Sequence, residues 1–76
     1  LGDHVVVATE NKTLPSAIGG LEMIYINNSG STITITRNGN DEIYESGSTT
    51  TATSVDVTAR QTIRLIAADA NNWYQI

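Results

Sequence analysis

The amino-acid sequence predicts an all-β domain, and three observations carry this prediction. Thr, Ser and Asn are abundant, while Lys and Glu, the usual residues of helix surfaces, are scarce. Thr, Ile, Val and Tyr favour a pleated, half-buried surface, and Asn, Gly and Ser favour turns. Short apolar runs alternate with these turn segments at fairly regular spacing, which is typical of a sandwich or a small barrel. We therefore expect a small antiparallel β-sandwich or jelly-roll-like domain of six or seven short strands, without a helix.

The first 12 residues predict a strand that leads in from an upstream segment. Val5-Val6-Val7 form a β-branched run within residues 4–9, and the chain begins with Leu1 rather than Met, so we expect a piece of a longer protein. Pro15 cannot donate to a strand ladder and forces Leu14 to be extended. We expect Leu14 to anchor the turn that follows. The predicted organisation is a lead-in segment, residues 1–12, followed by a β-sandwich trimerisation or tip domain, residues 13–76.

Residues 21–27 predict the second strand, which has apolar side chains on both faces. Met23 and Tyr25 share one face, and Ile24 and Ile26 share the other. One pair suffices for the core within the chain, so the other pair needs a partner. Because a chain of this length buries only about 60% of its unfolded surface, and because symmetric oligomers are the usual way to cover such a face, we expect a homotrimer.

The middle of the chain predicts two hairpins. The turn at residues 28–31 separates two apolar runs, which is a hairpin signal. In the strand that follows, residues 32–36, Ile33 and Ile35 point inward and the threonines point to solvent. Asn38-Gly39 then predicts a type I′ hairpin turn, which leads to a short charged strand, residues 41–45.

The remaining chain predicts one loop and three strands. Residues 46–53 are mostly small and polar, and Thr49-Thr50-Thr51 offers no apolar side chain that could be buried on one face of a strand. Alternation resumes at Val55 and Val57, and residues 62–67 form a strong strand with Ile63 and Leu65 on one face. Residues 73–76 form the last strand, in which Trp73 fills the core of a chain without Phe.

Charge and composition exclude several function classes. The net charge is −4, and the four Lys and Arg residues are scattered, whereas nucleic-acid binders show a basic patch. No apolar run approaches the ~20 residues of a spanning helix, so we expect no membrane insertion. The chain has no cysteine, and we expect neither a metal nor a cofactor.

The chemistry-bearing residues do not predict an enzyme. Asp41, Glu42 and Glu45 form the densest acidic group, and carboxylate groups serve glycoside hydrolysis or calcium binding. A charged edge strand that discourages aggregation explains them better. His4 is the one imidazole that is available as a neutral-pH base.

An ordered set of short motifs resembles a known class of modules. They run from Thr13-Leu14-Pro15 and Gly19-Gly20 through residues 23–28, 32–36, 40–43 and 62–67 to Trp73-Tyr74-Gln75-Ile76. This order resembles small all-β modules at the ends or joints of bacteriophage tail fibres and related prophage appendages. The resemblance implies a trimer within a virion fibre, or within an appendage exposed outside the cell.

Two functions follow from this resemblance. In the first, the module is a structural part that trimerises and caps or connects a fibre. Its core and trimer packing then uses Leu14, Ile24, Ile26, Ile33, Ile35, Ile63, Leu65 and Trp73. In the alternative, the module is a receptor-binding tip that contacts a host surface glycan or protein through Tyr44, Ser48 and Thr50. An exposed tyrosine ring suits a sugar face, while its hydroxyl forms a hydrogen bond.

Overall fold

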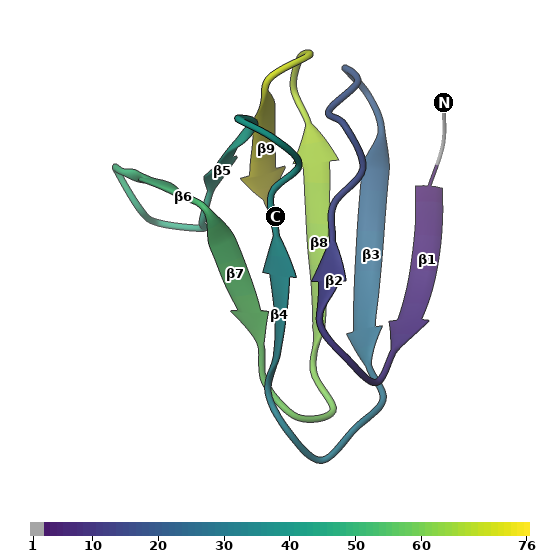
Figure 1. The fold of residues 1–76 in the computed structure, drawn as a ribbon. Helices are drawn as coiled ribbons and strands as arrows, with labels where there is room; N and C mark the ends of the chain where they lie inside the picture. Colours follow the sequence, from purple (N-terminus) through teal and green to yellow (C-terminus); the bar gives the residue numbers. More distant parts are fainter. Residues whose placement is uncertain (1–2) are drawn as a thin grey trace.

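Nine β-strands in two sheets make up residues 3–76, the part of the chain that the computed structural model describes (Figure 1). The larger sheet has the order β1 (Asp3–Ala8), β3 (Glu22–Asn27), β8 (Thr62–Ala67), β9 (Asn72–Gln75), β5 (Glu42–Tyr44) and β6 (Thr51–Ala52). The smaller sheet has the order β2 (Lys12–Thr13), β4 (Ile33–Thr36) and β7 (Ser54–Val57). No helix occurs in this described range, so the all-β prediction is confirmed.

Both sheets are mixed, so the prediction of purely antiparallel sheets is wrong. The pairs β1–β3, β5–β9 and β2–β4 are parallel, and the other neighbours are antiparallel. The described residues form nine strands, whereas the sequence predicts six or seven. The additional strands, β2 and β6, are two residues long. Segments this short carry no alternation of apolar and polar residues, so backbone pairing alone defines them.

Neither predicted hairpin forms, because each turn carries the chain from one sheet to the other. Residues 28–32 join β3 to β4, and residues 37–41 join β4 to β5. Gly39 has a φ of 55°, and the Asp41 N–H donates to the Asn38 carbonyl at 3.0 Å. A type I′ turn also needs positive φ at Asn38, but within residues 3–76 the only non-glycine residue with positive φ is Arg60.

The beginning of the described chain is integral to the larger sheet. β1 pairs with β3 over its full length, from Asp3 opposite Glu22 to Ala8 opposite Asn27. The boundary expected between residues 12 and 13 falls inside β2, which pairs with β4. The described residues 3–12 therefore share both sheets with the rest of the chain.

The apolar core lies between the two sheets, and the smaller sheet lies over one face of the larger one (Figure 1). Its buried members come from both sheets and from residues 14–21: Ala8, Leu14, Ala17, Leu21, Met23, Tyr25, Ile33, Ile35, Ile43, Val55, Val57, Leu65, Ala67 and Trp73. The Cα radius of gyration, 11.4 Å, equals the ~11 Å expected for a folded chain of this length.

Trp73 lies at the centre of this core with none of its surface exposed. Its indole N–H has no hydrogen-bond partner among the described residues. An unpaired buried donor costs roughly 1–3 kcal/mol, while burial of a large apolar side chain contributes roughly 1.5–3 kcal/mol or more. The ring is held here by its bulk rather than by its polar group.

Asn27 is a buried polar residue that ties three segments together at the end of β3. Its side-chain N–H₂ donates to the backbone carbonyls of Ser31, Val57 and Thr58 at 2.7, 2.9 and 3.2 Å. Its side-chain oxygen accepts from the Ser29 N–H and hydroxyl at 3.0 and 2.6 Å. The β3–β4 connection and the end of β7 are thus fixed by one amide.

Within the described range, no helix has the length and apolar character needed to cross a membrane.

Candidate functional site

The side of the larger sheet that faces away from the core carries two groups of apolar side chains, one on β1 and β3 and the other on β8, β9 and β5, with Thr62 and Arg64 of β8 between them. Met23 and Tyr25 of β3 point into the core, so Ile24 and Ile26 point to the opposite side. We call these side chains the outer apolar face, and by strand register they are Val5, Val7, Ile24, Ile26, Tyr44, Ile66 and Tyr74. Ile76 directly follows β9 and joins them by alternation, and its N–H donates to the Arg64 carbonyl.

Strand register brings these residues together from distant parts of the chain. Val5 lies opposite Ile24, and Val7 lies opposite Ile26. Further along the sheet, Ile66 of β8 lies opposite Tyr74 of β9.

These side chains are well exposed for apolar groups. The exposed fraction is 59% for Val5, 61% for Val7, 43% for Tyr74 and 61% for Ile76. Single exposed apolar residues are ordinary on a protein surface, but a contiguous patch marks an interaction site.

One ion pair, between Arg64 and Glu22, lies on the outer apolar face. Arg64 contacts Glu22 through Nε, at 2.8 Å from Oε2, and through Nη2. Glu22 is only 8% exposed, although it lies on the outer side of the sheet opposite the half-buried Ile66 and its partner Arg64 is exposed. Because the two charges already satisfy each other, burying this region costs less than burying an unpaired charge.

Two tyrosines stack at one end of the face. The rings of Tyr44 and Tyr74 have centroids 4.6 Å apart and lie within 8° of parallel. The Tyr44 hydroxyl donates to Glu42 Oε2 at 3.4 Å. Loss of hydration, followed by the nearby Glu42 carboxylate, raises the pKa of Tyr44, so the hydroxyl stays protonated at neutral pH.

The predicted receptor contacts lie beside this tyrosine pair. Tyr44, expected to be an exposed ring, is half-buried, and Tyr74 is the more exposed of the two. Ser48 and Thr50 are exposed and bond to each other, with the Ser48 hydroxyl donating to the Thr50 carbonyl at 3.1 Å. β6 fastens the end of the loop to β5, and Figure 1 shows this loop projecting from the side of the molecule.

The acidic group does not form a site. Asp41 Oδ2 accepts from the Ala17 N–H at 2.9 Å, which ties two connections together, and Glu45 is exposed. Within the described residues, no group of three His, Cys, Asp or Glu side chains is placed to hold a metal ion. The interpretation of this segment as an edge strand is wrong, because β5 lies between β9 and β6.

The predicted packing residues divide between two locations. Ile24 and Ile26 lie on the outer apolar face. The buried members are Leu14, Ile33, Ile35, Leu65 and Trp73, and Ile63 packs against them while partly exposed.

Sequence reasoning missed Val5, Val7 and Ile66 as members of the face. Val5 and Val7 alternate with Val6, which packs against the core. A continuous valine run hides this alternation, so the signal appears only when the register with β3 is known.

No protein-family model, no curated protein and no solved structure matched this chain.

Proposed function

We propose that this protein is a structural module that assembles with copies of itself through the outer apolar face. The observation that carries the proposal is the number of apolar side chains on one side of the larger sheet, where Val5, Val7, Tyr74 and Ile76 are exposed and Ile24, Ile26 and Ile66 are half-buried. Full burial of one such side chain contributes roughly 1.5–3 kcal/mol relative to exposure. A face with this many of them gains substantially when it is covered.

A second copy of the chain is the occupant that the surface chemistry favours. The face is mostly apolar and its Glu22–Arg64 pair is internally neutralised, while Glu42, on the same side of β5 as Tyr44, places one carboxylate at its end. The chain carries a net charge of −4, which disfavours an anionic membrane surface as the alternative cover. A chain of 76 residues also has a small core, for which oligomerisation is a common source of stability.

We propose further that the assembly is a homotrimer in a β-sandwich or jelly-roll-like arrangement, which caps or connects a bacteriophage tail fibre or a related appendage outside the cell. This part of the proposal rests on the resemblance of residues 13–76 to small β-modules of such fibres, with residues 1–12 as the connection to a preceding segment. The self-association rests on the outer apolar face.

The expected mass in solution is three times the 8.1 kDa of one chain. Light scattering at micromolar protein concentration measures it directly. A mass of twice the chain would keep the interface and reject the threefold symmetry. A folded single chain at these concentrations would reject both.

A second candidate function is recognition of a host surface glycan or protein by a fibre tip. The stacked Tyr44 and Tyr74 beside the projecting loop of residues 46–53 favour it, because aromatic rings offer flat faces to sugars. Replacing Tyr44 with alanine and shortening the loop around Ser48 and Thr50 is then expected to weaken adsorption of the labelled chain to host cells. Adsorption that survives both changes would reject this contact region.

We propose no catalytic role for the chain. Asp41 is engaged in a backbone hydrogen bond, and the Asp41, Glu42 and Glu45 group shows no matched pair of free carboxylates. Release of defined oligosaccharides from a capsular glycan, abolished by Glu42→Gln, would overturn this proposal.

A further inference from the structure

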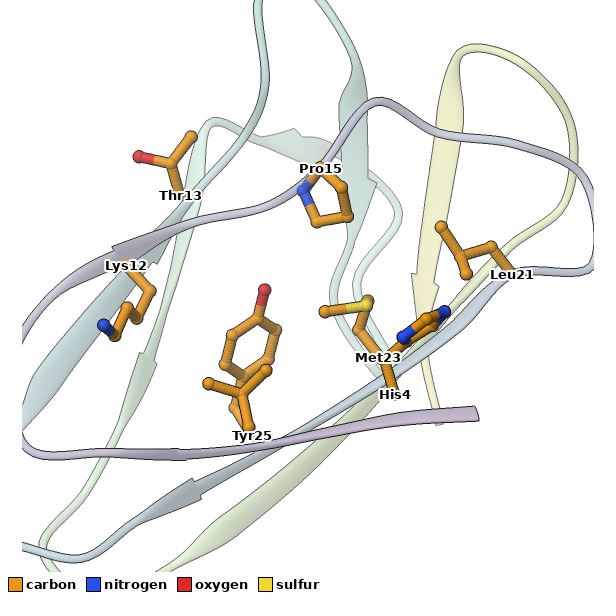
Figure 2. Close-up of a pocket in the computed structure, with 8 residues that line it drawn as sticks. His4, Lys12, Thr13, Pro15, Leu21, Met23 and Tyr25 are labelled. Atoms are coloured by element: carbon orange, nitrogen blue, oxygen red, sulfur yellow. The ribbon is translucent and has the colours of Figure 1, made fainter. Parts of the chain in front are cut away.

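A cavity of about 390 Å³ lies between the two sheets beside β1 (Figure 2). Its walls come from the inner side of β1 and β3 and from the segment that runs through β2 to Pro15. The apolar part of the lining consists of Val6, Pro15, Leu21 and Met23. This volume falls within the ~300–1,000 Å³ of pockets that hold small molecules in proteins.

Tyr25 supplies a hydroxyl that points into this cavity. The residue is 2% exposed, and Figure 2 shows its oxygen between Lys12, Thr13 and Pro15. No hydrogen bond joins this hydroxyl to another residue of the described chain, and burial raises its pKa, so it remains a protonated donor at neutral pH. A ligand that places an acceptor beside this hydroxyl forms a hydrogen bond that the described chain alone does not make.

Two nitrogen-bearing side chains line the cavity: Lys12 is half-buried and His4 is exposed. Lys12 lies opposite Ile35 of β4, and Ile35 is fully buried. The Lys12 side chain therefore leaves the backbone on the inner side of the smaller sheet. His4 lies opposite Met23 on the inner side of the larger sheet. Among the residues whose side chains the structure describes, no Asp or Glu lines the cavity. The lining therefore presents the Lys12 ammonium group without a carboxylate beside it, although the net charge of the chain is −4.

We infer that the cavity binds a small organic carboxylate with an apolar body. The carboxylate accepts from the Tyr25 hydroxyl and the Lys12 ammonium, while the body packs against Leu21 and Met23. Charge-assisted hydrogen bonds of this kind are the stronger ones. The cavity lies on the inner side of the larger sheet, opposite the outer apolar face, so this inference goes beyond the proposed assembly and does not depend on it.

The single methionine of the chain makes Met23 a direct reporter. With the methionine methyl group carbon-13 labelled, octanoate and 3-phenylpropanoate are titrated into the intact chain, and 1-octanol serves as the neutral probe. The Met23 methyl resonance is expected to shift and to saturate with at least one carboxylate, and 1-octanol is expected to bind at least ~10-fold more weakly, since hydrogen bonds to charged groups are the larger ones.

Variants identify the groups that hold the carboxylate. Tyr25→Phe and Lys12→Gln are each expected to weaken binding ~10-fold. Tyr25→Phe removes no hydrogen bond within the described chain, so its melting temperature is expected to stay close to that of the parent. Arg60→Gln removes a cation elsewhere and is expected to leave binding unchanged.

Several results would overturn the inference. These are a Met23 signal that does not move at millimolar carboxylate, equal affinity for 1-octanol, and affinity that is unchanged in both Tyr25→Phe and Lys12→Gln. In a second sample with carbon-13 labelled valine methyl groups, shifts confined to Val5 and Val7 would place the ligand on the outer apolar face and would also reject the cavity as the site.

Discussion

Replacement of Ile33 with alanine is expected to lower the free energy of unfolding by ~2–5 kcal/mol, the usual cost of truncating a buried aliphatic side chain. Ile33 is 3% exposed and lies opposite Val57 in the antiparallel β4–β7 pair. Truncation leaves a cavity between the sheets because β4 is the central strand of the smaller sheet and cannot move freely toward the larger one. Thermal denaturation at a fixed chain concentration measures the effect.

Thr34→Ala is the matched control for this variant. Thr34 is the next residue on the same strand, and its hydroxyl donates to Asp56 Oδ1 at 3.0 Å at an exposed position. Loss of one exposed hydrogen bond is expected to cost less than ~1 kcal/mol. Equal, small losses for both variants would show that the inner and outer sides of β4 are assigned wrongly.

The second large effect is expected at Asn27. Asn27→Ala removes the donor to three backbone carbonyls and the acceptor for Ser29, and leaves these buried or partly buried groups unpaired. With ~1–3 kcal/mol for each unpaired buried group and partial rescue by water, the expected loss is ~3 kcal/mol. Chemical denaturation at fixed chain concentration checks this value.

Two further variants separate the hydrogen bonds of Asn27 from its size. Asn27→Asp keeps the shape but places a carboxylate oxygen against backbone carbonyls, so it is expected to destabilise the protein at least as much as alanine. Asn28→Ala is the control, because the Asn28 side chain is exposed and accepts only from Arg60 Nη1 at 3.0 Å. A tolerated Asn27→Asp would contradict the role assigned to the amide.

Local patterns in the sequence are sufficient to locate most strands. The alternation of isoleucine and threonine around Ile33 and Ile35 and the apolar run at residues 62–67 correspond to β4 and β8. They succeed because alternation reports which side of a strand is buried, and burial dominates the energetics of these segments.

The pairing of strands was not predictable from the same patterns. Parallel pairs such as β1–β3 and β5–β9 join segments that are distant in sequence, and no turn motif specifies them. The sequence predicts hairpins at residues 28–31 and 37–40 because turn-forming residues indicate a change of direction but not which sheet the chain enters next. Asn27 is predicted as the end of a strand, but its buried side-chain hydrogen bonds to residues 31, 57 and 58 depend on contacts that no local pattern specifies.

The surplus apolar character of β3 was visible in the sequence, but the candidate site was not. Ile24 and Ile26 become a continuous surface only through their register with Val5 and Val7. Lys12 likewise reads as part of a polar break until its inward position opposite Ile35 is known. In both cases the side of the sheet on which a residue lies, and the residues beside it, depend on strand pairing and not on a local motif.

The central claim is that copies of the chain associate through the outer apolar face, and sedimentation equilibrium on two charge variants tests it most directly. The double variant Val5→Lys with Val7→Lys places two charges on that face at positions 59% and 61% exposed, where the fold itself tolerates them. Ile18→Lys adds a charge at another exposed apolar residue, 50% exposed and outside the sheet. The account predicts that the unmodified chain and Ile18→Lys sediment at three times the chain mass and that the double variant sediments as a folded single chain. A double variant that keeps the assembled mass, or an unmodified chain that is already a folded monomer, would contradict it.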